Sequence, residues 1–269
     1  MSRTDSGTRA SKHIAIPVPR RVLSFDGTEI WYDFYEAAGD AAVVILPGFW
    51  RTRRHPALTQ LAATISRRGH SVAVVDLRGH GDSGGRFGFN REEYRDVEAV
   101  LTDVERHRGR LRLVVVGLSL GGAVAVTLTA RSDFDIQGLI LISAVADFEK
   151  IRPRVNPFEL PRHLAFGQAF RWPRFDWRFL RSPKLVAAEE IRNVSCPACL
   201  IHVVGDWLIN HEHSRALQAA HRGPCDLHLI EVPGGYHADR IFSAAPGRVE
   251  AIIERFLDER FSLDVDGSS

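Results

Sequence analysis

The chain has 269 residues, of which 45% are hydrophobic and 25% charged, the composition of a globular protein with one large domain or two small ones. Its 35 Lys and Arg nearly balance its 33 Asp and Glu, and the formal net charge of +2 argues against nucleic-acid binding or strong attraction to a membrane. The polar first residues lack a secretory signal, no run reaches the roughly 18 apolar residues of a membrane span, and three cysteines do not suggest a disulfide framework, so we expect a cytoplasmic protein.

The first predicted elements form an antiparallel hairpin. Two extended segments, 20–25 and 28–37, flank Asp26-Gly27, and an Asp-Gly pair between such runs is a strong hairpin signal. Beyond it, runs rich in Val, Ile and Leu alternate with segments that are apolar at helical spacing. Strands are expected within 42–48, 71–81, 111–117, 136–145, 197–206 and 226–235, and helices within 56–69, 90–107, 120–132, 212–222 and 246–261. This alternation predicts an α/β fold whose central sheet is mostly parallel, with helices on both faces and an antiparallel N-terminal hairpin.

One long insertion interrupts this pattern. Residues 147–190 are punctuated by prolines and dominated by aromatic residues and arginines. Open parallel sheets bind ligands at the carboxyl edge of their strands, and the insertion follows a strand, so we expect it to form a small lid over that edge. The core is then 13–146 with 191–262, and the polar ends, 1–12 and 263–269, are expected to be disordered.

The segment LVVVGLSLGGAV, residues 113–124, places Ser119 between a predicted strand and a predicted helix. Gly117 and Gly121 tolerate a strained backbone there, so that the serine hydroxyl can project above the sheet edge. An ordinary strand-to-helix turn can have the same glycine spacing. The strand before the motif and the small-residue helix after it favour a nucleophile, which needs a base because a serine hydroxyl alone is a poor nucleophile.

Among the twelve histidines, His237 is the predicted base. It lies in the glycine-rich loop EVPGGYHADR after the last predicted strand, where an imidazole can reach across the sheet edge. His80 is expected to brace a glycine-rich turn, and His202 and His228 to pack as core histidines. His55 is expected to help start a helix, and His107, His211 and His221 fall on predicted helices.

Asp206 is the predicted acid that orients the imidazole, because it follows the strand that contains PACLIHVVG. Asp147 occupies the equivalent position one strand earlier and remains an alternative, its other expected role being to cap the first turn of the insertion. Asp76 is expected to organise the RGHG loop. The chain order Ser119, Asp206, His237 is that of the triad found on strand-elbow folds.

A serine hydrolase also needs backbone N–H donors directed at the developing oxyanion. Leu120, directly after the nucleophile, is one predicted donor, and Phe49 in the loop VVILPGFW is the other. An ordinary turn at the end of that strand is the alternative interpretation of the loop.

Together these features resemble the α/β-hydrolase superfamily, and the resemblance covers about 20–262. Its most specific motifs are VVDLRGHGDSGG, GLSLGG, GDWLIN and GGYH, in the order expected of the family. The resemblance implies that Ser119, His237 and Asp206 are nucleophile, base and acid. This chain departs from the family at Pro47-Gly48, where many members have His-Gly. Since the oxyanion donor is a backbone group, activity should survive this difference.

The insertion corresponds to the lid of that family, which sets substrate choice. Its expected substrate-binding side chains are aromatic: Phe148, Phe166, Phe170, Trp172 and Trp177. An amphipathic lid with solvated arginines is one interpretation. Another is a site for a bulky apolar or anionic group, with Arg171, Arg174 and Arg178 binding the charge, and docking on a membrane surface or an acidic carrier protein is a third. The CPAC motif leads into a strand, which favours packing over redox chemistry.

The expected function is hydrolysis of a carboxylic ester or thioester through an acyl-enzyme, without a metal or organic cofactor. The expected partner is a small-molecule substrate, with no nucleic acid and no membrane span. The same residues would also serve a hydrolase of amides or of carbon–carbon bonds, and the same fold can serve a non-catalytic binding protein. Substrate identity and oligomeric state do not follow from the sequence.

Overall fold

The computed structural model of the chain describes residues 16–153, 173, 174, 176, 177 and 184–261. The ends for which disorder is expected, 1–12 and 263–269, lie outside these residues, as does most of the predicted lid. None of the helices in the described ranges combines the length and the apolar character that crossing a membrane requires.

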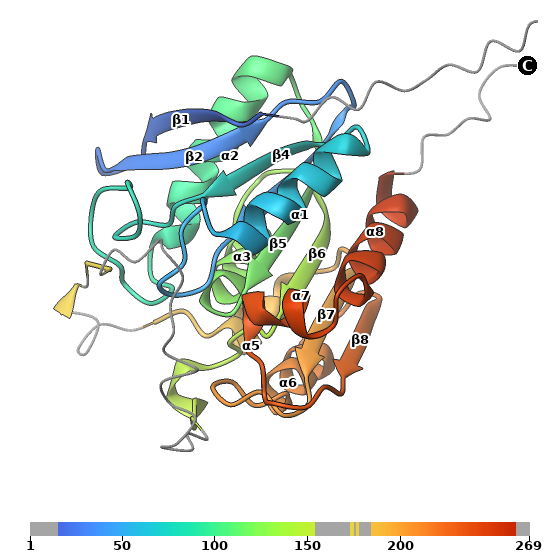
Figure 1. Cartoon of the computed structure of the whole chain (residues 1–269). Coiled ribbons are helices and arrows are strands. Elements are labelled where there is room, and N and C mark those ends of the chain that lie inside the picture. Colours follow the sequence, from blue (N-terminus) through green and yellow to red (C-terminus); the bar gives the residue numbers. More distant parts are fainter. Residues whose placement is uncertain (1–15, 154–172, 175, 178–183, 262–269) are drawn as a thin grey trace, which may run out of the picture.

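The described residues form a central sheet of eight strands in the order β1-β2-β4-β3-β5-β6-β7-β8 (Figure 1). β1 pairs with β2 and β2 with β4 in antiparallel fashion, whereas all later pairs are parallel, which confirms the predicted fold class. The strands are β1 Val18–Leu23, β2 Glu29–Tyr35, β3 Ala41–Leu46, β4 Ser71–Val75, β5 Arg112–Leu118, β6 Ile136–Ile142, β7 Ala198–Val203 and β8 Cys225–Ile230.

Helices cover both faces of this sheet (Figure 1). Buried side chains of α1, α7 and α8 belong to the core on one face, and those of α2, α3, α5 and α6 to the core on the other. The helices are α1 Pro56–Arg67, α2 Glu93–Arg108, α3 Leu120–Arg131, α5 Ala187–Glu190, α6 Glu212–Ala220, α7 Ile241–Ala244 and α8 Arg248–Phe261, with the short 3₁₀ helices η1 Phe148–Lys150, η3 Ile191–Asn193 and η4 Ala238–Arg240.

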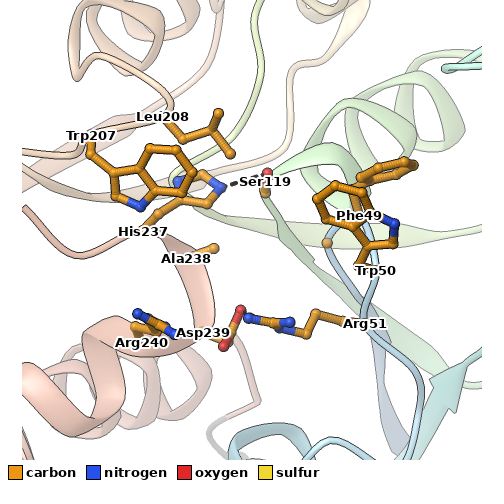
Figure 2. A pocket seen from close by; sticks show the side chains of 11 residues that line it. Phe49, Trp50, Arg51, Ser119, Trp207, Leu208, His237, Ala238, Asp239 and Arg240 are labelled. Carbon is orange, nitrogen blue, oxygen red and sulfur yellow. Dashed lines mark hydrogen bonds and ion pairs between the residues drawn. The ribbon is translucent and has the colours of Figure 1, made fainter. Parts of the chain in front are cut away.

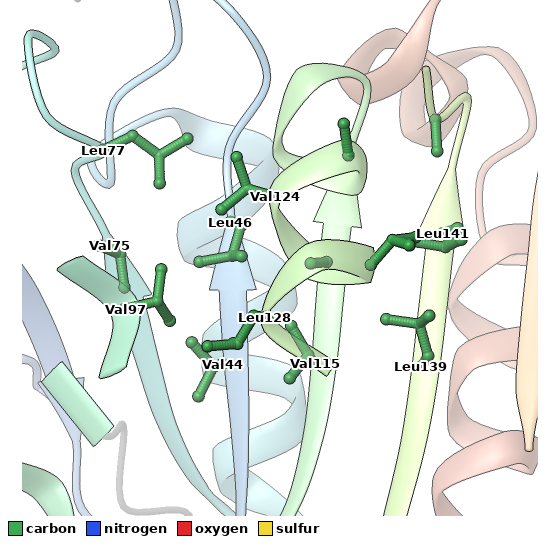
Figure 3. Packing of buried hydrophobic residues seen from close by; sticks show 14 of the residues in the cluster. Val44, Leu46, Val75, Leu77, Val97, Val115, Val124, Leu128, Leu139 and Leu141 are labelled. Atoms are coloured by element: carbon green, nitrogen blue, oxygen red, sulfur yellow. The ribbon is translucent and has the colours of Figure 1, made fainter. Parts of the chain in front are cut away.

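Two-sided burial explains why the strand sequences are continuously apolar. In β3, Val44 and Leu46 belong to the core on the α3 side, while Val43 and Ile45 belong to the core on the α1 side. Figure 3 shows Val44 and Leu46 with Val124 and Leu128 of α3 between the helix and the sheet. Both faces of the strand are therefore shielded from water, and a polar side chain at any of these positions would lack a hydrogen-bond partner.

The glycines around Ser119 allow α3 to lie very close to the sheet. A Cβ added to Gly117 would lie 2.6 Å from the Gly121 carbonyl oxygen, and one added to Gly122 would lie 2.5 Å from the Ala144 Cβ. A Cβ on Gly121 would lie 2.2 Å from the carbonyl oxygen of Leu46 at the end of β3. The glycine motif is therefore required by packing as well as by backbone conformation.

The described part of the lid is attached to the core through its main chain. Arg174 N–H donates to the Gly79 carbonyl at 2.9 Å, Phe87 N–H donates to the Arg174 carbonyl at 2.7 Å, and Asp176 N–H donates to the Phe87 carbonyl at 3.0 Å. The Arg174 guanidinium also donates to the Ser83 carbonyl. This arginine is thus bound to the loop after β4.

The cysteines of the CPAC motif do not have the environment of a redox pair. Cys199 is buried on β7 and Cys196 is half-buried just before it. Burial raises the pKa of Cys199 to about 12 and that of Cys196 to about 11, so both thiols stay protonated. A catalytic dithiol requires the opposite shift, and the packing interpretation is supported.

We expect Gly121→Ala to lower the free energy of unfolding by about 3 kcal/mol, because the new methyl group meets backbone atoms that cannot rotate away. Gly205→Ala is the matched control, since its added Cβ meets nothing closer than 3.7 Å; it should cost less than about 1 kcal/mol. Urea unfolding of both variants measures the difference, and equal stabilities would contradict the close approach of α3 to β3.

Candidate active site

Ser119 lies on a strained turn between β5 and α3. Its φ of 51° and ψ of −115° are unusual for a residue other than glycine. Backbone hydrogen bonds hold this conformation: Ser119 N–H donates to the Ile142 carbonyl at 2.8 Å, and the Ser119 carbonyl accepts from Gly122 and Val145. The turn thus fixes where the serine hydroxyl points.

His237 and Asp206 complete a hydrogen-bonded chain with this serine (Figure 2). Ser119 Oγ lies 2.8 Å from His237 Nε2, and His237 Nδ1 lies 2.7 Å from Asp206 Oδ2. An ionised carboxylate only accepts hydrogen bonds, so Nδ1 carries the proton and donates it. In the neutral imidazole, Nε2 is then the acceptor, and the serine O–H donates to it.

Asp206 is held by the loop that follows β7. Its Oδ1 accepts hydrogen bonds from Leu208 N–H at 2.9 Å and from Ile209 N–H at 3.0 Å, and its side chain is not exposed. Burial by itself raises the pKa of Asp206, but the electrostatic interaction with His237 and hydrogen bonds from His202 and His237 outweigh burial and hold the pKa well below its usual range. The carboxylate therefore stays ionised.

His202 is a site residue that the sequence analysis placed only in the core. It is fully buried on β7, and its Nε2 lies 2.9 Å from the Ile209 carbonyl and 3.5 Å from Asp206 Oδ2. Because the carbonyl accepts, Nε2 carries the proton, and Nδ1 accepts from the Ser214 hydroxyl at 2.7 Å. Its position four residues before Asp206 was the only sequence signal for this role.

The other candidate carboxylates have different partners. Asp147 accepts from Glu149 N–H at 2.9 Å and caps η1, the role expected of it if it were not the acid. Asp76 is buried, forms an ion pair with Arg53 and accepts from Asp82 N–H at 3.0 Å, so it organises the loop after β4. The structure brings Asp206, not Asp147, to His237.

The predicted oxyanion donors belong to two segments that lie next to Ser119. Leu120 begins α3, and the N–H groups in the first turn of a helix have no acceptor within the helix. Gly48 passes directly against the serine, since a Cβ added to it would lie 3.2 Å from Ser119 Cβ. Phe49 follows in a tight turn closed by Arg51 N–H to the Gly48 carbonyl at 3.0 Å, in which Trp50 has a φ of 62°.

A small pocket of about 90 Å³ opens beside the serine. In Figure 2, Phe49 and Trp50 lie on one side of Ser119, and Trp207 and Leu208 lie with His237 on the other. The described residues lining it are Gly48, Phe49, Trp50, Arg51, Ser119, Trp207, Leu208, His237, Ala238, Asp239 and Arg240. The sequence analysis did not single out Trp50, Arg51, Trp207, Leu208, Asp239 or Arg240 as site residues.

The predicted lid aromatics are only partly placed. Phe148 packs edge-on against Phe89 at a centroid distance of 6.0 Å, and Phe89 in turn lies 5.9 Å from Phe49. Trp177 is 70% exposed. Phe166, Phe170 and Trp172 lie outside the described residues, as do Arg171 and Arg178.

Comparison with known proteins places the chain in a hydrolase family. The family described as serine aminopeptidase, S33, matches residues 37–178, about half of the chain. The lysophosphatidylserine lipase ABHD12 of Macaca fascicularis is 28% identical over 223 residues, which are 78% of this chain and 53% of that protein. The chain therefore spans about half the length of this curated relative.

Solved structures share the fold over nearly the whole chain. The esterase Pf2001 of Pyrococcus furiosus has a TM-score of 0.70 at 16% identity, covering 91% of this chain and 93% of its own. DcsB, solved with a substrate analogue, has a TM-score of 0.76 at 16% identity, covering 92% of this chain and all of its own. At such low identities the likeness establishes the α/β-hydrolase fold.

We expect His202→Leu to reduce the free energy of unfolding by about 2–5 kcal/mol, because the Ile209 carbonyl and the Ser214 hydroxyl would each lose a buried partner. His228→Leu on the neighbouring β8, where the side chain is partly exposed, is the control and should cost less than about 1 kcal/mol. Urea unfolding measures both; a His202 variant as stable as its control would contradict the hydrogen-bonding role.

Proposed function

Because the chain belongs to the serine aminopeptidase S33 family of α/β-hydrolases, we propose that it is a serine hydrolase that cleaves carboxylic esters or thioesters through an acyl-enzyme. The single observation that carries this proposal is the hydrogen-bonded chain from Ser119 through His237 to Asp206. Its nucleophile sits on a strained turn, its base is in the required tautomer, and its acid is buried and ionised.

In the proposed reaction, Ser119 Oγ attacks the ester carbonyl carbon while His237 Nε2 takes the hydroxyl proton. The imidazolium that forms is stabilised by Asp206, 2.7 Å from Nδ1. Collapse of the tetrahedral intermediate breaks the bond to the leaving alcohol or thiol, which receives the proton from Nε2. Water then gives a proton to the same nitrogen, attacks the acyl-enzyme and releases the acid, and the proton returns to Ser119.

The oxyanion of each tetrahedral intermediate is bound by the N–H groups of Phe49 and Leu120. The close approach of Gly48 to Ser119 supports this assignment, because it brings the Phe49 loop next to the carbon under attack. Donors of this kind are already oriented before charge develops, and losing one typically costs about 10²–10³ in kcat. The side chain at residue 47 takes no part, so proline there is compatible with the proposal.

Two observations favour an ester over a peptide as the substrate. An aminopeptidase substrate presents an N-terminal ammonium group, which calls for an available carboxylate in the pocket. Among the described lining residues, Asp239 is the sole carboxylate, and it is paired with Arg51 at 2.8 Å. The curated relative is named as a lipase and the structural relative Pf2001 as an esterase, which supports an ester as the bond that is cleaved.

We expect Ser119→Ala to lower kcat/KM for p-nitrophenyl esters by about 10⁴-fold or more and to abolish labelling by a fluorophosphonate, whose phosphorus bonds to Oγ with loss of fluoride. Ser143→Ala, in the turn after β6, is the control and should still label. Equal labelling of wild type and Ser119→Ala would overturn the assigned nucleophile. Failure of the wild type to label or to hydrolyse any ester, thioester or aminoacyl amide would favour a binding protein.

We expect Asp206→Asn to lower kcat by about 10⁴-fold, because an amide can donate a hydrogen bond to Nδ1 and thereby stabilise the wrong tautomer of His237. Asp147→Asn should keep kcat within about threefold of the wild type, since this residue caps η1. Steady-state kinetics of both variants with one ester provide the comparison. The reverse result would assign Asp147 as the acid.

A further inference from the structure

The pocket beside Ser119 and a second, larger hollow share a wall. The second hollow is a groove of about 640 Å³ between α1 and the segment that contains α7 and the start of α8. Arg51, Asp239 and Arg240 line both spaces. The pocket, at about 90 Å³, is below the roughly 300–1,000 Å³ of typical small-molecule sites, whereas the groove falls within that range.

The shared wall is built around an ion pair. Arg51 Nε donates to Asp239 Oδ1 at 2.8 Å, and the two side chains are only 14% and 9% exposed. His55 Nε2 lies 3.4 Å from the other carboxylate oxygen. Figure 2 shows Arg51 and Asp239 facing each other across one side of the pocket, with Arg240 beside them. We call the Arg51 and Asp239 side chains the partition.

The partition joins the two loops that carry the proposed chemistry. Arg51 lies two residues after Phe49, the proposed oxyanion donor, and Asp239 lies two residues after His237. His55 directly precedes α1 and lines the groove next to the partition. An ion pair between residues 188 positions apart thus spans the space between these loops.

The positive charge of Arg51 and the negative charge of Asp239 neutralise each other, and the neighbouring His55 adds no charge. Burial lowers the pKa of His55, and the charges of Arg51 and Arg240 lower it further against the opposing charge of Asp239. His55 is therefore neutral near pH 7, and both guanidinium groups lie close enough to act on it. An apolar chain could pass from the pocket into the groove only by separating this pair, which would leave two buried charges without their partners.

The groove beyond the partition offers the length that the small pocket lacks. Its described lining includes apolar side chains from α1 and from the segment around α7, namely Ala57, Leu61, Phe242 and Pro246. An extended alkyl chain that passed the partition could bury its methylene groups there. In the native chain, the ion pair stands between these side chains and Ser119.

We propose that Arg51 and Asp239 are specificity-determining residues: their ion pair closes the pocket on this side and limits the length of the substrate chain that lies there. This inference rests on the proposed ester hydrolysis and narrows its substrate class to esters whose group at this wall is short. Removing both side chains joins the pocket to the groove and allows a longer alkyl chain. Removing both avoids leaving one buried charge without its partner.

The test uses the full-length Arg51→Ala/Asp239→Ala variant with two ester series. One series is p-nitrophenyl esters from acetate to dodecanoate, and the other is alkyl acetates from ethyl to dodecyl. We expect the ratio of kcat/KM for long over short chains to rise at least about tenfold in one series, because extra methylene groups gain a binding surface. Asp239 lies two residues after His237, so removing its side chain can displace the base. Because long and short chains are compared within one variant, the resulting general loss of activity cancels out of the ratio.

Matched variants separate this effect from a general loosening of the fold. Arg68→Ala/Asp258→Ala removes another Arg–Asp pair, at the end of α1 and on α8, that lines neither the pocket nor the groove, and it should leave the ratio unchanged. Adding Ala57→Phe to the double variant should fill the groove and restore the short-chain preference. If the double alanine variant does not fold, Arg51→Ser/Asp239→Asn, which keeps polar groups at the wall, is measured in its place.

The outcomes distinguish this inference from the function on which it rests. A double variant that is labelled by fluorophosphonate and hydrolyses esters, but whose chain-length ratio is unchanged in both series, overturns the partition and leaves the proposed hydrolase intact. A wild type that already prefers long chains in both series also overturns it. A wild type without any Ser119-dependent hydrolysis overturns the proposed function and the partition together.

Discussion

The tight turn at Ser119 is the constraint on which the rest of the candidate site depends. A positive φ at a serine costs conformational free energy. It persists here because Ser119 is the single residue between the end of β5 and the start of α3. The turn can close only if α3 lies against the ends of β3 and β6, and Gly121 and Gly122 leave the room for these two approaches. The position of the serine hydroxyl is therefore determined by the packing of the whole central sheet.

The other site residues are brought to this fixed point by loops at the same edge of the sheet. Parallel strands present their carboxyl ends together, so the residues after β3, β5 and β7 are neighbours although they are far apart in the chain. Around Asp206, the backbone N–H groups of Leu208 and Ile209 and the imidazole of His202 share the task of holding one buried charge. These donors take the place of water around a carboxylate that has to stay ionised away from solvent.

Much of this arrangement could be predicted from the sequence, for physical reasons that are local. The Asp26-Gly27 hairpin, the two-sided apolar strands and the glycines around Ser119 follow from short-range backbone and burial requirements. The placement of Asp206 and His237 followed from loop position in an alternating fold. What could not be predicted were side-chain pairings between distant elements, such as Arg51 with Asp239, and the partners of His202, because burial of a strand residue does not reveal what its polar atoms meet. The lid aromatics have no periodicity that would fix the directions of their side chains.

The way in which the described lid segment joins the core has a consequence for how such proteins diversify. The bonds that Arg174 and Asp176 form with the loop at 79–87 are made largely by main-chain groups, which every amino acid except proline supplies in full. Side chains in this stretch can therefore change without detaching it, whereas the loop that receives it retains its own internal support. The identity of the described lid residues can therefore vary while their main-chain attachment to the loop after β4 is kept.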